Sequence, residues 1–157
     1  VLMNQQFIAK ELLLIGGGHA HVILLRMLGM KPIPGLQVTL VSPDVRTPYS
    51  GMLPGVVAGH YTQDDIHIDL VRLCRFAGAR FIRGTASHID AAGKSVQVEG
   101  RPDLGYDVLS MNIGITPSVS NVKLNQDVIA VKPISKFLKQ NTKIKEQTNR
   151  KASLKNQ

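Results

Sequence analysis

The hydrophobic pattern at the start of the chain predicts a strand, a turn, a helix and a second strand. Residues 10–15 end in four consecutive apolar side chains, which is typical of a parallel strand covered on both faces. Three glycines follow at once, and residues 20–30 then place apolar side chains near helical spacing. After a loop with two prolines, residues 36–41 are again apolar and β-branched. This order is that of a βαβ unit, whose crossover should be right-handed.

The middle of the chain predicts a long loop, a helix and a third parallel strand. Residues 42–60 are rich in Pro, Gly, Ser and Tyr, and a loop of this length is usually functional or disordered. Asp69 is a candidate N-cap for the amphipathic helix that follows it, and Gly78 would end that helix. Residues 80–82 predict a short strand at the position of a third parallel strand.

Further along, the pattern changes to the alternation of antiparallel strands. Residues 85–90 and 95–98 predict a hairpin with Gly93 in its turn, and a third strand is expected near residues 106–111. Beyond residue 118 the pattern decays. A short helix is expected near residues 135–140, and the later Lys, Asn, Gln and Thr residues leave little to bury, so residues 142–157 are expected to be disordered.

Length and composition place limits on the class of protein. A chain of 157 residues is enough for one domain, and its single cysteine, Cys74, excludes an internal disulfide or a CxxC redox pair. No apolar run reaches the length of a membrane-spanning helix, and the N-terminus lacks the features of a signal peptide. A cytoplasmic location is therefore expected. Five histidines show no spacing typical of a metal site, so no metal is expected.

The net charge of +8 is concentrated near the C-terminal end. Residues 1–120 hold ten Lys or Arg against nine Asp or Glu, a balance of +1, whereas residues 121–157 hold nine against two, a balance of +7. A basic segment of this kind raises the hypothesis of nucleic-acid binding. Because Phe137 is the only aromatic residue in the segment, a solvated tail explains the charge equally well and no nucleic-acid partner is expected.

The glycines after the first strand carry most of the chemical information. Gly16 and Gly18 match two of the three glycines in the G-x-G-x-x-G fingerprint of dinucleotide-binding proteins. Gly16 would allow the tight turn, and Gly18 would let a pyrophosphate approach the backbone at the N-terminus of the helix. The third glycine is replaced by His21, which is expected to push the helix outward or to point to the side.

The acidic partner for the ribose also departs from the fingerprint. An acidic residue is expected about 20 positions after the glycines, at the end of the second strand. Here that strand ends in Val41-Ser42-Pro43-Asp44. Ser42 would hydrogen-bond the ribose weakly, and Asp44 would do so better if the loop turns back.

Several segments of the chain resemble one family. The run from Leu14 to Val22, Leu-Ile-Gly-Gly-Gly-His-Ala-His-Val, resembles the start of the FAD-dependent pyridine nucleotide-disulfide oxidoreductase superfamily. Within it the chain is similar to the type II NADH dehydrogenase-like branch, including proteins fused to selenide, water dikinase, in which a histidine stands at the third glycine position. The segments that also resemble this branch are residues 41–44, 47–55, 58–61, 66–70 and 76–84, and the resemblance covers about residues 11–138.

The resemblance and the patterns together imply an α/β fold class. We expect a Rossmann-like FAD-binding domain with a parallel sheet and a small antiparallel β-meander, followed by a disordered basic C-terminal tail. Residues 8–120 would form the FAD-binding domain, as an incomplete counterpart of the family's domain. Residues 121–141 would begin a linker to an NADH-binding domain, and residues 142–157 would form the tail.

The resemblance also implies which residues contact FAD. The loop from Tyr49 to Pro54 would lie along the isoalloxazine ring, Ala86 would place its backbone beside the adenine, and residues 112–114 would form a second FAD contact at a strand end. From the residues alone, that last stretch is equally compatible with a core strand ending in a turn. The expected cofactor-binding residues are Gly16, Gly18, His19, Ala20, Ser42, Asp44, Arg46, Met52, Leu53, Pro54, Ala86, Asn112 and Gly114. No catalytic side chain is expected, because the flavin carries the chemistry.

The function implied by the resemblance is that of the FAD-binding portion of an NAD(P)H oxidoreductase. The flavin would take hydride from NADH or NADPH and pass electrons to a small-molecule acceptor, a quinone or another compound. The chain is expected to stop before the part that binds NADH and before the C-terminal Gly-Asp motif that closes the flavin site. The alternative hypothesis is a non-catalytic nucleotide-binding remnant. Membrane association is not indicated, and a homo-oligomer remains open.

Overall fold

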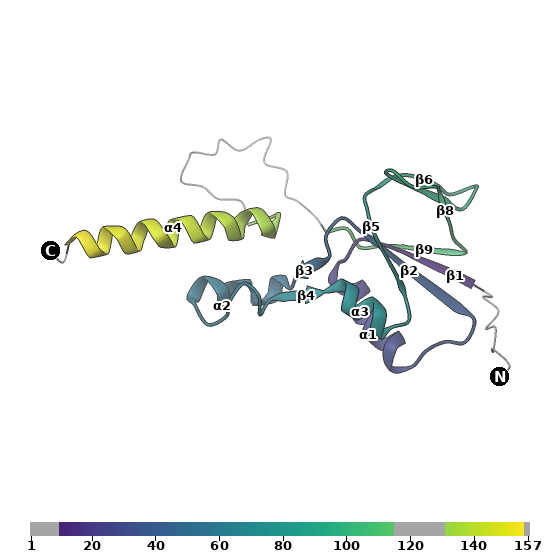
Figure 1. Ribbon diagram of the computed structural model, residues 1–157, viewed down its shortest axis with the longest axis horizontal. Coiled ribbons are helices and arrows are strands. Elements are labelled where there is room, and N and C mark those ends of the chain that lie inside the picture. Colours follow the sequence, from purple (N-terminus) through teal and green to yellow (C-terminus); the bar gives the residue numbers. More distant parts are fainter. Residues whose placement is uncertain (1–9, 115–130, 156–157) are drawn as a thin grey trace. The chain divides into compact units, whose positions relative to one another are not determined.

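The computed structural model describes residues 10–114 and 131–155, and its described part contains two compact units (Figure 1). Of the described residues, the first unit consists of residues 10–47 and 68–114, and the second of residues 48–67 and 131–155. Each unit is described by itself below.

A four-stranded parallel sheet forms the centre of the first unit. Its strand order is β5-β2-β1-β9, with β1 at Lys10–Ile15, β2 at Leu36–Ser42, β5 at Arg80–Arg83 and β9 at Val108–Met111. The pairings of β1 with β2, of β1 with β9 and of β2 with β5 are all parallel. The expected order of strand, turn, helix and strand is therefore confirmed, and so is the third parallel strand.

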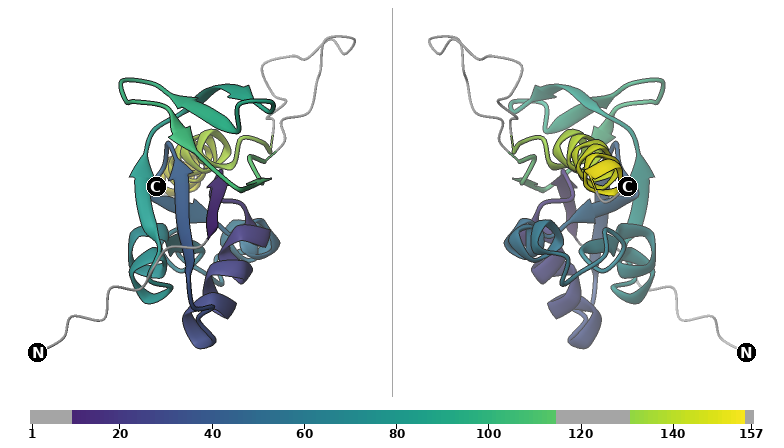
Figure 2. Two further views of the ribbon diagram at one scale, coloured as in Figure 1. Left: turned by 90° about the vertical axis from the view of Figure 1, so that its right-hand side faces the viewer. Right: turned by 90° about the vertical axis from the view of Figure 1, so that its left-hand side faces the viewer.

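Helices cover one face of this sheet. Helix α1 (His19–Met30) and helix α3 (Leu70–Phe76) lie on the same side in Figure 1, and the views in Figure 2 show the same layering. Their apolar side chains form one core with alternate side chains of β1 and β2, among them Leu14 and Leu40, both fully buried. The neighbouring Leu13 packs on the opposite face of the sheet. Burial on both faces explains why β1 reads as a continuous apolar run.

The opposite face of the sheet carries a small antiparallel meander. It consists of β6 (Ala86–Asp90), β7 (Ser95–Val98) and β8 (Leu104–Gly105), and it appears on the side of the sheet away from α1 and α3 in Figure 1. The expected hairpin is confirmed by the antiparallel pairing of β6 with β7. Its left-handed residue is Lys94, with φ +50°, rather than Gly93. A Cβ at Gly93 would meet only the side-chain carboxylate of Asp90, which accepts a hydrogen bond from the Gly93 N–H at 2.8 Å.

The strand expected near residues 106–111 is confirmed as β9. The third strand of the meander is the two-residue β8, and β9 joins the parallel sheet beside β1. Asp107 helps to direct the chain there, because its N–H donates to the Glu11 carbonyl at 2.9 Å and its carboxylate accepts from the Glu11 N–H at 2.8 Å. The residue just before β9 is thereby attached to β1.

The expected loop at residues 42–60 contains regular structure. It includes β3 (Arg46–Pro48), the 3-10 turn η1 (Ser50–Met52) and α2 (Leu53–Ala58), and β3 forms a two-stranded sheet with β4 (His67–Asp69). Proline is compatible with the first turn of a helix, and Pro54 stands there in α2. Gly59 ends α2 in the left-handed conformation with φ +85°. The expectation of a long irregular loop is therefore corrected.

The helix signals around α3 are confirmed. The Asp69 carboxylate accepts a hydrogen bond from the Arg72 N–H at 2.9 Å, which is the N-cap contact that the sequence predicts. At the other end, Gly78 adopts a positive φ of +65° directly after the C-cap. Both signals are local, so they could be read correctly from sequence.

The second unit is built from η1, α2 and α4 (Ile134–Lys155). Its apolar core joins Leu53 and Val56 of α2 with Ile66 and with Leu138 of α4, all buried. Two polar contacts link α4 to the same region. The Lys145 Nζ donates to the Val56 carbonyl at 3.0 Å, and the Gln63 side-chain amide donates to the Thr142 hydroxyl at 3.0 Å.

Helix α4 corrects the expectation for the end of the chain. A short helix was expected near residues 135–140 with disorder over residues 142–157, whereas the helix continues to Lys155. Lys, Gln, Glu and Arg are strong helix formers, so a segment with little to bury remains helical once a packed turn has nucleated it. The burial of Leu138 provides that packed turn. Residues 121–130 of the expected linker lie outside the described residues.

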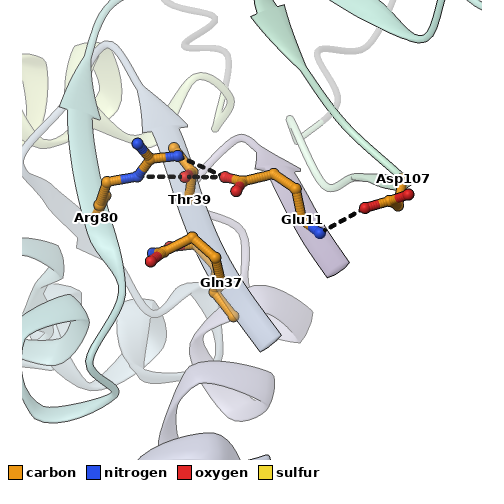
Figure 3. A network of polar contacts seen from close by, with 6 residues as sticks. Glu11, Gln37, Thr39, Arg80 and Asp107 are labelled. Carbon is orange, nitrogen blue, oxygen red and sulfur yellow. Dashed lines mark hydrogen bonds and ion pairs between the residues drawn. The ribbon is translucent and has the colours of Figure 1, made fainter. Parts of the chain in front are cut away.

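Polar side chains form a network across three strands of the parallel sheet (Figure 3). Glu11 Oε1 accepts from the Thr39 hydroxyl at 2.9 Å and from Arg80 Nη2 at 2.6 Å, and Arg80 Nε donates to the Thr39 hydroxyl at 3.1 Å. Lys10 forms an ion pair with Asp107 at 3.4 Å. Glu11 and Arg80 lie at the amino ends of β1 and β5, and Thr39 lies in the middle of β2. This group is called the amino-edge network after its two charged members.

Candidate functional site

The carboxyl ends of the parallel strands bring together residues that are distant in sequence. Gly16 follows β1, Ser42 ends β2, Gly84 follows β5 and Asn112 follows β9. Backbone hydrogen bonds hold these ends in register. They run from Gly16 N–H to the Val41 carbonyl at 2.8 Å, from Gly84 N–H to the Ser42 carbonyl at 3.1 Å and from Asn112 N–H to the Ile15 carbonyl at 2.8 Å. In open parallel sheets, ligands bind at this edge.

Gly16 and Gly18 are both required by the close approach of Asn112. Gly16 has φ +91°, and a Cβ on it would lie 2.8 Å from the Asn112 carbonyl carbon and 2.8 Å from Ile113 Cα. A Cβ on Gly18 would coincide with the Asn112 side-chain amide, and the Gly18 N–H donates to the Asn112 carbonyl at 3.1 Å. A larger residue at Gly18 would therefore displace Asn112 whether or not a ligand binds. Such a variant would not report on pyrophosphate binding alone.

The N-terminus of α1 has the features of an anion site. Gly18 is the N-cap, no side chain caps the helix and its first turn contains no acidic residue. His19 and Ala20, the first two residues of the helix, are exposed. The first turn of a helix presents partial positive charge, which favours a phosphate. Together with the glycine turn, these residues fit the pyrophosphate of a dinucleotide.

His21 corrects the expectation drawn from the fingerprint. Its side chain was expected to push the helix outward or to point aside, but it is 2% exposed and lies under the glycine turn. Nδ1 is 2.7 Å from the Gly16 carbonyl oxygen, and Nε2 is 3.0 Å from the Ser110 hydroxyl of β9. Sequence reasoning missed this contact because His21 and Ser110 are 89 residues apart.

The candidates for ribose contact lie at the end of β2 and just after it. Ser42 is buried, and its hydroxyl lies 3.4 Å from the Cβ position of Gly17, so it sits directly beneath the glycine turn. Asp44 is exposed two residues later, and Arg46 is exposed at the start of β3. Ser42 is thus placed at the turn by the fold, whereas contact of Asp44 or Arg46 with a ribose remains a prediction.

The remaining expected cofactor contacts are distributed between the two units. Ala86 begins β6 and packs against the core of the meander face, and Gly114 follows β9 with φ +74°. Met52, Leu53 and Pro54 belong to the second unit, where Leu53 is 6% exposed and packs in the apolar core. The contact of these five residues with FAD remains a prediction.

Other candidate chemistry in the described part of the chain is limited. Burial raises the pKa of the Cys74 thiol to about 11, so the thiol stays protonated at neutral pH. Within residues 10–114 and 131–155, no group of three or more His, Cys, Asp or Glu side chains is arranged to hold a metal. Over the same ranges, no helix has the length and apolar character needed to cross a membrane.

Comparison with solved structures identifies the fold. The sulfide:quinone oxidoreductase of Aquifex aeolicus superposes with a TM-score of 0.73 and 22% identity over 90% of this chain. The two proteins share their fold over this region. NDH2 of Plasmodium falciparum, solved in complex with NADH, gives a TM-score of 0.60 with 17% identity over 73% of this chain. The putidaredoxin reductase of a covalent complex with putidaredoxin gives 0.58 with 18% identity over 74%.

The shared fold and the parallel sheet confirm the α/β fold class inferred from the sequence. This chain spans 33% of the length of the sulfide:quinone oxidoreductase and 24% of that of NDH2. No protein-family model matches the sequence, and no curated protein matches it either. The shared fold places the Gly16 turn at the edge of the sheet where dinucleotides bind in Rossmann-like domains.

Proposed function

We propose that this chain binds FAD through the turn at Gly16–Gly18 and serves as the FAD-binding part of an oxidoreductase. The observation that carries the proposal is the glycine turn joined to an uncapped helix at the carboxyl edge of a parallel sheet. The fold shared with a sulfide:quinone oxidoreductase, with NDH2 and with a putidaredoxin reductase supports the same function. The pyrophosphate would lie against the first turn of α1, and the ribose near Ser42 and Asp44.

In this proposal the protein supplies binding and orientation. When bound, the flavin supplies the redox chemistry, with hydride from NADH or NADPH and electrons passed to a small acceptor such as a quinone. The backbone of the glycine turn and the positive end of α1 would compensate the charge of the phosphates. Met52, Leu53 and Pro54 would lie along the flavin ring and Ala86 beside the adenine, with Asn112 and Gly114 as a second contact. A cytoplasmic location belongs to the same proposal.

A charge change at Ala20 tests the phosphate site without disturbing the glycines. Ala20 is exposed in the first turn of α1, where a carboxylate stabilises a helix by about 0.3–1 kcal/mol. Ala20→Glu should therefore fold at least as well as the wild type. It should bind FAD about tenfold or more weakly, because its charge repels the pyrophosphate. The measurement is flavin fluorescence titration with a thermal melt of each protein.

The matched control is Ala20→Gln, which adds the same volume without charge. It should bind FAD within about threefold of the wild type, since only the electrostatic repulsion is missing. Equal affinity of the Glu and Gln variants would contradict the phosphate site at α1. Failure of the wild type to bind FAD would contradict the proposed function as a whole.

A second candidate function is nucleotide binding without turnover. It rests on the same glycine turn and uncapped helix, which would hold a dinucleotide whether or not turnover follows. Hydride transfer needs the nicotinamide and flavin rings held in contact, and such positioning contributes about 7–11 kcal/mol at most to lowering a barrier. NADH oxidation by the FAD-loaded 157-residue chain, compared with free FAD, separates the two functions. A rate close to that of free FAD would favour binding without turnover, whereas rapid, saturable turnover would favour the oxidoreductase.

A further inference from the structure

The position of His21 sets the direction of its two hydrogen bonds. It is the third residue of α1, and its ring lies between the Gly16 carbonyl and the Ser110 hydroxyl. A carbonyl oxygen can only accept a hydrogen bond, so Nδ1 of His21 carries the hydrogen and donates it. In the neutral ring Nε2 then accepts from the Ser110 hydroxyl. The imidazole thereby joins the first turn of α1, the end of β1 and strand β9.

The bond to Gly16 also determines how the next peptide group is oriented. The peptide bond is planar and trans, so the C=O and the following N–H point in opposite directions. Because the Gly16 carbonyl points inward to His21, the Gly17 N–H points away from His21, to the outside of the turn. Among the described residues, that N–H has no hydrogen-bond partner.

The inward orientation of the Gly16 carbonyl needs a hydrogen-bond donor to maintain it. Glycine residues on both sides of a peptide group leave it free to rotate, because no Cβ restricts their backbone angles. The Gly16–Gly17 peptide is flanked in this way, and Gly16 already lies in the positive-φ region at +91°. Without a donor beneath it, the Gly16 carbonyl could turn outward, and a carbonyl oxygen facing a phosphate repels it.

We propose that His21 is a positioning residue for anion recognition by the glycine turn. Its Nδ1–H holds the Gly16 carbonyl inward, so that the Gly17 N–H faces outward to meet the pyrophosphate of a dinucleotide. The inference rests on the proposed function and deepens it. In the fingerprint, the third glycine allows the helix to pack closely on the strand because it has no side chain. Here a buried histidine stands at that position and orients the turn through a hydrogen bond instead.

Two substitutions at His21 separate the donor from the bulk of the ring. His21→Asn keeps an N–H donor on the atom bonded to Cγ, where Nδ1 of histidine stands, whereas His21→Leu fills the space without a donor. ADP carries the pyrophosphate and AMP does not, so both are titrated against each variant by calorimetry. We expect Leu to weaken ADP about tenfold or more and AMP less than about threefold, with Asn within about threefold of the wild type for both ligands. The exposed His88→Asn serves as a matched control and should leave both affinities unchanged.

NMR of the ligand-free protein tests the hydrogen bond from His21 to the Gly16 carbonyl independently of nucleotide binding. Two-bond nitrogen–proton couplings should show His21 as the Nδ1–H form, and the Gly17 amide resonance should stay near its wild-type position in the Asn variant and move in the Leu variant. A His21 ring with its hydrogen on Nε2, or equal ADP affinity in the Leu and Asn variants, would overturn the proposal. If the NMR result holds but the wild type binds neither ADP nor FAD, the proposed function is overturned, whereas the hydrogen bond from His21 to Gly16 remains supported.

Discussion

The two edges of the parallel sheet satisfy their polar groups in different ways. At the amino edge, the charged side chains of Glu11 and Arg80 bond to one another and to Thr39, and the Arg80 side chain is 59% exposed. At the carboxyl edge, most of the bonds come from backbone groups of the glycine turn and of Asn112, supported by the buried ring of His21. The polar groups at the amino edge are therefore joined by charged side chains, whereas those at the carboxyl edge are joined mainly by backbone groups of a turn.

This difference indicates which edge tolerates change. Exposed ion pairs contribute about 0–1 kcal/mol, because water and salt screen them. The carboxyl edge depends on positive φ angles and on contacts with backbone atoms that cannot move aside. We therefore expect large effects of substitutions at the carboxyl edge and small ones at the amino edge.

The largest effect is expected for Gly16→Ala. A Cβ at Gly16 would meet the backbone of Asn112 and Ile113, and the residue has φ +91°, so the variant should lose about 3 kcal/mol or more of unfolding free energy. Gly78→Ala is the matched control, because Gly78 also has a positive φ but has open space around its Cβ position. It should lose only about 1–2 kcal/mol. Urea denaturation measures both, and equal losses would contradict the role of Asn112 in confining the turn.

A smaller effect, on affinity rather than stability, is expected for Asp44→Ala. Asp44 is exposed just beyond β2, so its removal should leave the melting temperature unchanged. If its carboxylate bonds the ribose, FAD affinity should fall by about 1–3 kcal/mol, the usual cost of a hydrogen bond to a charged group. Asp103→Ala, at another exposed aspartate of the same unit, should leave FAD affinity unchanged. Unchanged affinity in Asp44→Ala would shift the ribose contact to Ser42 or to the backbone.

A double-mutant cycle at the amino edge should give a small coupling energy between Glu11 and Arg80. Glu11→Gln and Arg80→Met remove the two charges of the ion pair separately and together. Their coupling energy should be below about 1 kcal/mol and should decrease further in high salt, because the pair is partly exposed. Urea denaturation of the four proteins measures it. A coupling energy of several kcal/mol that is independent of salt would contradict the proposed contrast between the two edges.

The smallest effect expected is a change in the pH dependence of stability at Asp107. The Glu11 N–H, with a further contribution from Lys10, lowers the pKa of the Asp107 carboxyl. Its stabilising contribution is thus complete above the unfolded-state pKa of about 4 and is lost as the pH falls through the lower folded-state pKa. Asp107→Asn should therefore lose less stability than the wild type on acidification from about pH 6 to about pH 3. Parallel acid-induced losses in the two proteins would show that Asp107 does not contribute.

The sequence by itself determined the elements whose signals are local. The apolar run of β1, the glycines after it and the spacing of α1 lie within about 20 consecutive residues. The resemblance to a family rests on this stretch and on further short segments up to residue 84. The N-cap of α3 at Asp69 and its end at Gly78 are also local signals, and the structure confirms both. The hairpin of β6 and β7 follows from alternation and a short turn. For the ends of α3 and the hairpin, the interacting atoms are close together in the chain.

Only the tertiary structure decided which distant residues meet at the carboxyl edge. Nothing near His21 in sequence indicates Ser110 as its partner, and nothing near Gly18 indicates that the side chain of Asn112 occupies the space beside it. Both contacts exist because β9 pairs with β1, an arrangement fixed by long-range packing and by Asp107. Helix α4 shows the same limit, since the burial of Leu138 against α2 anchors a segment whose composition alone indicates disorder. Local patterns specify where strands and helices form, whereas the neighbours of a buried side chain depend on how the sheet assembles around it.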